Sequence, residues 1–129
     1  MSEAPFTYTI NNLAYDELRP KSEKATLGLW DPSPQTIPGR TRSDEIKVTP
    51  KGRSPYVKGL VVYQVDSDES AWVKIGWDIP GHGSINIVNV ETSHPEIIAA
   101  LDGYDGRQDT ESITVTVVDA RSTKSGGNG

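Results

Sequence analysis

Apolar and polar residues alternate at every second position in several stretches of this chain. In residues 6–10, the apolar Phe6, Tyr8 and Ile10 are separated by two threonines. Successive side chains of a β-strand point to opposite faces, so this period predicts a strand with one face in a core. β-Branched valine, isoleucine and threonine, which suit a pleated sheet, are also abundant. We predict strands at 6–10, 25–30, 45–49, 57–66, 71–77, 84–91 and 113–118.

Proline and glycine interrupt the predicted strands at short intervals. Turn-forming sequence occurs at 31–34, at 38–39 and at 50–52, and residues 79–83 join two strands as a hairpin-like connection. Short strands separated in this way predict an all-β protein, built as a sandwich or a barrel. We expect a single domain over residues 1–121, because no repeat or linker divides the chain.

Two segments depart from the regular pattern. Residues 95–101 fit either a helical turn or a strand, because their apolar positions agree with both periods. Residues 122–129 are rich in glycine, serine and asparagine, which predicts a flexible tail.

The charge of the chain limits its partners. The net charge is −5, and acidic residues concentrate in 61–129, where eleven Asp and Glu oppose four Lys and Arg. Nucleic-acid binding needs a dense basic surface, so it is not expected. In 1–60 nine basic residues oppose seven acidic ones. Six of these nine fall between Arg40 and Lys58, where a solvated face is the simplest interpretation.

The sequence shows no segment typical of secretion or of membrane insertion. Residues 1–9 lack a basic region followed by an apolar run, and no apolar run approaches the roughly 20 residues that span a bilayer. The absence of cysteine excludes disulfides and thiol chemistry. We expect a soluble protein without a signal peptide, either cytoplasmic or released by another route, for which any action on a membrane would be peripheral.

The sequence does not favour catalysis. His82 lies between two glycines and His94 precedes a proline, and neither has the spacing of a metal site or a catalytic triad. The acidic stretch 102–111 lacks the regular spacing of a calcium loop, so it is interpreted as an ordinary connection. We therefore predict a protein that is not an enzyme and that needs no metal or other cofactor.

Three tryptophans lie at or near the ends of predicted strands. The two-residue period places Trp72 and Trp77 on opposite faces of one strand. For both, and for Trp30, a position in the core is the default interpretation. A tryptophan exposed beside a loop would instead suit a membrane interface or a sugar, because its ring is apolar and its N–H is polar.

An ordered set of short motifs resembles the aegerolysin family. Each motif is short, but their order and spacing, and the length of the chain, agree with that family over about residues 5–121. The motifs are Gly52-Arg53-Ser54, Gly59 after four intervening residues, the turn Trp77-Asp78-Ile79-Pro80, Gly83-Ser84-Ile85-Asn86 and the strand Ile113-Thr114-Val115.

The resemblance implies a β-sandwich of mainly antiparallel strands that recognises membrane lipid headgroups, of sphingolipids or phospholipids. Family members often act with a larger perforin-like partner, which forms the pore of a toxin while the small protein targets the membrane. The two motif-bearing loops would then lie side by side at one end of the sandwich. Carried over by position, the ligand-binding residues would be Arg53, Ser54, Lys58, Trp77, Asp78 and His82.

The chain departs from the family pattern in the turn that follows Asp78. The family usually has a cysteine before the proline and a second tryptophan after it, and here these positions hold Ile79 and Gly81. Lys58 stands where the family often has an acidic residue, which would favour a phosphate. Two alternatives stay open: a lectin-like module that binds sugars through exposed loop residues, and a protein-interaction sandwich without membrane activity.

Overall fold

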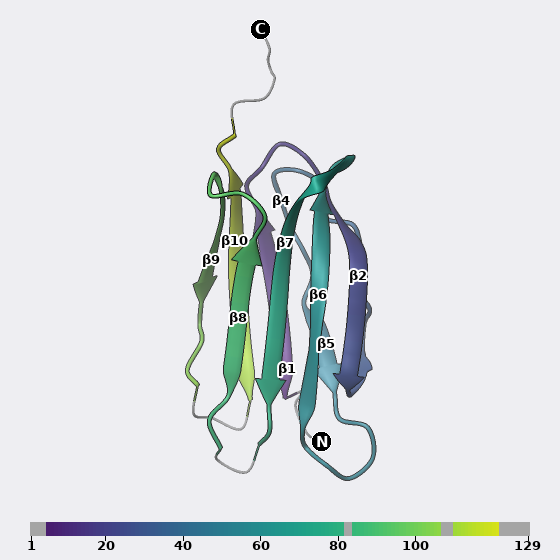
Figure 1. Ribbon diagram of the computed structural model, residues 1–129. Helices are drawn as coiled ribbons and strands as arrows, with labels where there is room; N and C mark the ends of the chain where they lie inside the picture. Colours follow the sequence, from purple (N-terminus) through teal and green to yellow (C-terminus); the bar gives the residue numbers. More distant parts are fainter. Residues whose placement is uncertain (1–4, 82–83, 107–109, 122–129) are drawn as a thin grey trace, which may run out of the picture.

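The computed structural model describes residues 5–81, 84–106 and 110–121, and this part of the chain contains strands but no helix (Figure 1). It therefore contains no apolar helix of the length that crosses a bilayer. His82 and the predicted flexible tail, 122–129, lie outside the described residues. The strands are β1 (Phe6–Asn12), β2 (Leu18–Leu27), β3 (Leu29–Trp30), β4 (Thr41–Arg42), β5 (Ile46–Thr49), β6 (Val57–Val65), β7 (Asp68–Ile79), β8 (Ile87–Thr92), β9 (Ile97–Asp102) and β10 (Glu111–Asp119).

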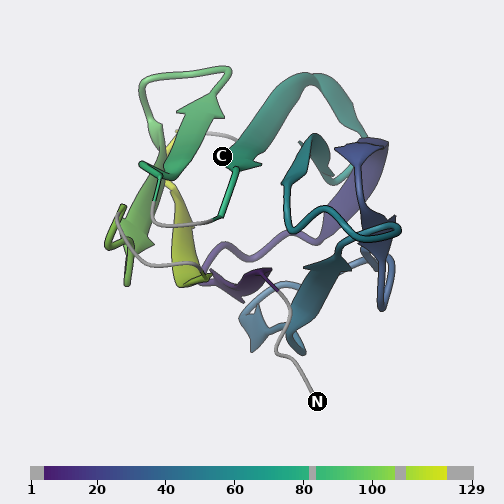
Figure 2. The ribbon, with the colours of Figure 1, turned by 90° about the horizontal axis from the view of Figure 1, so that it is seen from below.

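The strands form two sheets that enclose the core between them (Figure 2). One sheet has the order β3-β5-β1-β10-β9, with β4 paired to β1, and the other has the order β2-β6-β7-β8. The pairings between these strands are antiparallel except for that of β1 with β10, which is parallel. The predicted sandwich of mainly antiparallel strands is therefore confirmed. Of the two alternatives for residues 95–101, the strand is correct, since β9 occupies most of that segment.

The alternating stretches bury one face and expose the other. On β1 the side chains of Phe6, Tyr8 and Ile10 are fully buried, and β7 buries every second residue from 71 to 79. The removal of this apolar surface from water is the main term that stabilises the sandwich. At the centre of the core the hydroxyls of Tyr8 and Tyr63 form a 2.7 Å hydrogen bond, and burial raises the pKa of both phenols.

The connections between strands gather at the two ends of the sandwich (Figure 1). One end carries the β2–β3 turn at Gly28, the β5–β6 loop (50–56), and the β7–β8 and β9–β10 connections. This end is called the Arg53 end. The opposite end carries the β1–β2 loop with Tyr15 and the turns that join β6 to β7 and β8 to β9, and it is called the Tyr15 end.

Candidate functional site

The loop that carries Gly52-Arg53-Ser54 and the turn that carries Trp77-Asp78-Ile79-Pro80 are neighbours at the Arg53 end. They flank the adjacent antiparallel strands β6 and β7, in which Lys58 stands opposite Asp78. Beyond the strands the two loops touch, since a Cβ built on Gly81 would lie 3.0 Å from Pro55 Cγ. The predicted proximity of the two motifs is therefore confirmed.

Asp78 is the centre of a small polar cluster at this end. Its carboxylate accepts a hydrogen bond from the hydroxyl of Tyr56, which raises the pKa of that phenol. On its other side it faces Lys58, with Nζ 3.9 Å from Oδ2. Both charged side chains are partly exposed, so the pair contributes little to stability. Both charges of this pair are accessible to solvent.

A pocket of about 210 Å³ opens beside this cluster, between the Gly-Arg-Ser loop and the β2–β3 turn. Lys51, Ser54 and Tyr56 supply polar groups to its lining, and Leu27 supplies an apolar side. The Ser54 hydroxyl accepts a hydrogen bond from the Tyr56 backbone N–H at 3.2 Å, which orders the loop. Arg53 is exposed on the same loop. An ammonium, a guanidinium and a hydroxyl in one loop suit an anion such as a phosphate.

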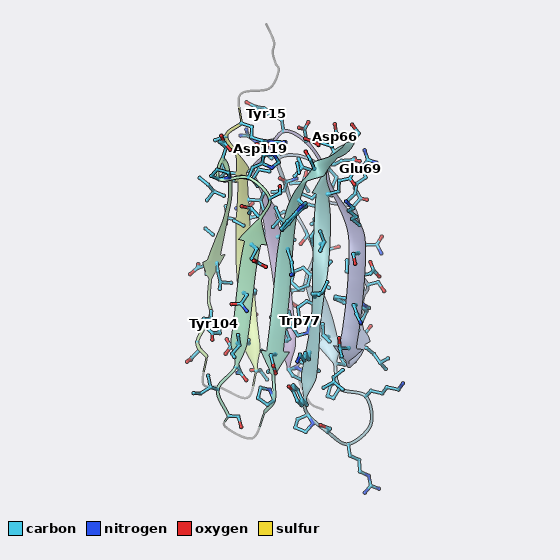
Figure 3. The ribbon with its side chains drawn as sticks, in the orientation of Figure 1. Tyr15, Asp66, Glu69, Trp77, Tyr104 and Asp119 are labelled. Atoms are coloured by element: carbon cyan, nitrogen blue, oxygen red, sulfur yellow. The ribbon has the colours of Figure 1, made fainter. Side chains whose placement is uncertain are left out.

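Trp77 lies inside the sandwich and does not line this pocket (Figure 3). Its side chain is 3% exposed, stacks on Phe6 with ring centroids 4.9 Å apart and meets Trp30 edge-on at 5.4 Å. The ring occupies space left by Gly59, where a Cβ would lie 2.9 Å from Trp77 Cζ2. The core position taken as the default is confirmed, and Trp72, on the opposite face as predicted, is partly exposed. The resemblance implied Trp77 as a ligand-binding residue, but the buried ring lies beneath the site and would touch a lipid only by leaving the core.

Sequence reasoning missed a group of exposed apolar side chains at the Arg53 end. Ile85 is 68% exposed, Ile87 is 48% exposed and Tyr104, labelled in Figure 3, is 40% exposed. A signal was present, because Ile87 lies on the outward face of β8 with Asn89 and Glu91, and Ile85, two residues before it, continues the same alternation. This signal was not recognised because the inward positions of β8 are also apolar, so the sequence does not show which face of the strand is exposed.

Charged side chains lie at both ends. Lys51 and Arg53 are exposed on the β5–β6 loop at the Arg53 end. Asp66 and Asp119, at the Tyr15 end (Figure 3), are paired with Arg19 at 3.5 Å and Arg121 at 2.8 Å. Within the described residues, no three His, Cys, Asp or Glu side chains gather as they would around a metal ion. The Arg53 end presents charged and exposed apolar side chains together.

The fold defines an aegerolysin-like β-sandwich. RahU protein, whose crystal structure was determined in complex with a TRIS molecule, superposes with a TM-score of 0.74 over 94% of this chain and 100% of its own, at 8% identity. IP-1A from Alcaligenes faecalis superposes with a TM-score of 0.69 over 92% of this chain and 94% of its own, at 15% identity. Both are aegerolysin-family proteins, so the resemblance is confirmed in the fold. No model of a protein family and no curated protein sequence matches the chain.

Proposed function

We propose that this protein recognises lipid headgroups at a membrane surface, as the targeting component of a pore-forming or toxin system, and that it is not an enzyme. The main support is that a basic loop, an ion pair open to solvent and exposed apolar side chains share one end of the sandwich. The fold adds support, because aegerolysin-like sandwiches are generally not enzymes. The partner that forms the pore would be a larger, perforin-like protein.

A zwitterionic headgroup, of a phospholipid or a sphingolipid, fits the polar groups of the site best. In the proposed complex its phosphate binds Lys58 and Arg53, with a further hydrogen bond from Ser54, and its amine binds the carboxylate of Asp78. His82, in the adjoining loop, is a further proposed contact. The net charge of −5 would repel an anionic bilayer, so the attraction has to be local. TRIS, which RahU holds in its crystal structure, is itself a small amine.

The test is a co-sedimentation assay with vesicles that differ in headgroup: choline and ethanolamine, each on a glycerol and on a sphingoid backbone, and serine on glycerol. The native chain is expected to bind at least one zwitterionic composition more tightly than the serine lipid. Arg53→Glu is expected to weaken that binding at least about tenfold, because it removes a charge-assisted bond to the phosphate. Asp78→Asn is expected to weaken binding of ethanolamine lipids more than binding of choline lipids, since a primary ammonium donates hydrogen bonds to a carboxylate.

The matched control is Arg42→Glu, which changes the net charge by the same amount on exposed strand β4, which pairs with the far end of β1. It is expected to leave vesicle binding unchanged. Equal losses in both variants would mean that only overall charge matters, which contradicts a site at Arg53. A correctly folded native chain that binds none of the vesicles would overturn the proposed function.

A second candidate function is sugar binding, and one groove favours it. The groove lies on the outer face of β6, β7 and β8, measures about 350 Å³ and includes Gly76. A Cβ on Gly76 would have its nearest neighbour at 3.8 Å, so there is room for the Cβ of Gly76→Val, a variant designed to fill the groove. Glycan-array signals that disappear in this variant, together with no vesicle binding, would favour a lectin-like function. The polar residues of the groove are Lys58, Lys74, Asp78, Asn89 and Glu91.

A further inference from the structure

The β7–β8 and β9–β10 connections form one unit at the Arg53 end. The hydroxyl of Tyr104 donates a short hydrogen bond to the backbone carbonyl of Asn86. The backbone N–H of Asn86 in turn donates to the carbonyl of Gly106 at 2.7 Å. These bonds join a connection of one sheet to a connection of the other. Tyr104 is therefore bonded to Asn86, the residue that follows Ile85.

The carboxylate of Glu111, at the start of β10, fastens this unit to the sandwich. Its side chain is 2% exposed, although it is a charged group. Oε2 accepts hydrogen bonds from the Gly106 backbone N–H at 2.7 Å and from Asn86 Nδ2 at 3.0 Å. Oε1 accepts one from the Asp105 backbone N–H at 2.9 Å. Three donors directed at one buried carboxylate make a rigid support, because a charge in the protein interior is costly unless it is hydrogen-bonded.

The apolar side chains that this support presents are not covered by the protein itself. Ile85 is 68% exposed, more than any other aliphatic side chain in the described residues, and the ring of Tyr104 lies nearby with its hydroxyl turned to the backbone. Clusters of exposed large apolar residues mark surfaces that meet another apolar phase. Asn86, which follows Ile85, and Asp105, which follows Tyr104, are each hydrogen-bonded to the Glu111 carboxylate.

The neighbouring charged residues indicate what binds to this apolar surface. Lys51 and Arg53 project from the neighbouring β5–β6 loop, and the β7–β8 turn at Gly81 lies against Pro55 of that loop. A surface with cations on one side and apolar tips on the other matches a lipid interface, where phosphates lie just outside the acyl chains. A tyrosine and an isoleucine are residues that partition into such a boundary.

We propose that Ile85 and Tyr104 form a rigid apolar anchor that enters the boundary between lipid headgroups and acyl chains when the basic loop binds phosphates. This inference rests on the proposed membrane function and adds which connections insert. It also assigns Glu111 as the positioning residue of the anchor. The anchor takes the place of the tryptophan that the family's turn usually carries, and which is Gly81 in this chain.

The chain has no cysteine, so single labels can be introduced cleanly. Ile85→Cys is labelled with an environment-sensitive fluorophore, and Ile98→Cys, from a side chain 51% exposed on β9, is the matched control. On binding to vesicles the label at 85 is expected to shift to the blue and to be quenched by lipids brominated in the acyl chains. The label at 98 is expected to stay in water. In parallel, Ile85→Ser is expected to weaken vesicle binding about tenfold, and Ile98→Ser to leave it unchanged.

The outcomes separate the anchor from the proposed function. If the labelled protein binds vesicles while the label at 85 remains in water, the anchor is wrong and headgroup recognition stands. If neither serine variant weakens binding, the anchor is likewise overturned. If the native chain binds no vesicle, both proposals fail. A native dimer in light scattering that Ile85→Ser converts to a monomer would assign the surface to a second copy of the chain and also overturn the anchor. Thermal melting of both serine variants verifies that they are folded.

Discussion

Replacement of Trp77 tests whether its ring only packs in the core or also contacts a lipid directly. The ring is 3% exposed and stacks on Phe6, so Trp77→Ala deletes a buried aromatic ring and leaves a cavity. Truncations of this kind cost about 3–5 kcal/mol of unfolding free energy. Because a whole domain is stable by about 5–15 kcal/mol, the alanine variant is expected to be folded but marginal.

Trp77→Phe is expected to behave differently, for a reason specific to this site. The indole Nε1 is buried and has no hydrogen-bond acceptor among the described residues. An unpaired buried N–H costs about 1–3 kcal/mol, and phenylalanine removes it. The smaller ring loses packing worth about 1–2 kcal/mol. The two effects nearly cancel, so the unfolding free energy of Trp77→Phe is expected to stay within about 1 kcal/mol of the native value.

Urea denaturation followed by circular dichroism measures both changes, and vesicle co-sedimentation below the melting temperature measures binding. Both variants are expected to bind vesicles as the native chain does while they are folded. A loss of less than about 1 kcal/mol in Trp77→Ala, or of more than about 3 kcal/mol in Trp77→Phe, would refute the packing argument. A fully folded Trp77→Phe whose vesicle binding falls more than tenfold would show that the ring contacts the lipid directly.

Four further substitutions test individual contacts. Gly59→Ala would place a Cβ 2.3 Å from a backbone oxygen, so it is expected to lower the unfolding free energy measured in urea by more than about 2 kcal/mol. The control Gly76→Ala, whose Cβ has its nearest neighbour at 3.8 Å, is expected to lower it little. Equal losses of unfolding free energy in the two variants would contradict this packing argument. Glu111→Gln replaces one carboxylate oxygen by an amide N–H₂, which would face N–H donors of the loops. The variant is expected to lose about 2 kcal/mol of unfolding free energy and to melt at a lower temperature. An unchanged melting curve would mean that the carboxylate does not hold the loops. Hydrogen bonds from Ser70, and then from an arginine, lower the pKa of Asp68 to about 2. The stabilisation that the ionised Asp68 contributes is therefore present above about pH 4 and lost as the pH falls towards 2. Asp68→Asn is expected to remove this part of the loss of stability in acid. A stability–pH profile of Asp68→Asn identical to the native one would contradict this expectation.

Part of the candidate site could be predicted from the sequence and part could not. The two motif-bearing loops are recognisable as short strings, and their strands could be expected to pair as a hairpin, so their proximity was within reach. The role of Glu111 could not be predicted, because it depends on hydrogen-bond donors from residues 86, 105 and 106, which lie on two different connections. Its sequence context, between Thr110 and Ser112, gives no sign of burial. Only the folded chain brings those donors together.

The structure divides the predicted strand 25–30 at Gly28 and adds residues 18–24 of β2, which alternation did not predict. Where alternation is clear, the sequence by itself determined the strand and the side that faces inward. That information is local, since a two-residue period such as Phe6, Tyr8 and Ile10 specifies both the extended backbone and its buried face. Tertiary structure alone decided which strands are neighbours, as in the parallel pairing of β1 with β10, whose partners Phe6 and Glu111 are far apart in the chain. It also decided that Trp77 fills the space above Gly59 while Ile85 stays exposed. Alternation alone does not show which apolar residues are buried, because the burial of a side chain depends on whether the opposite sheet packs against it.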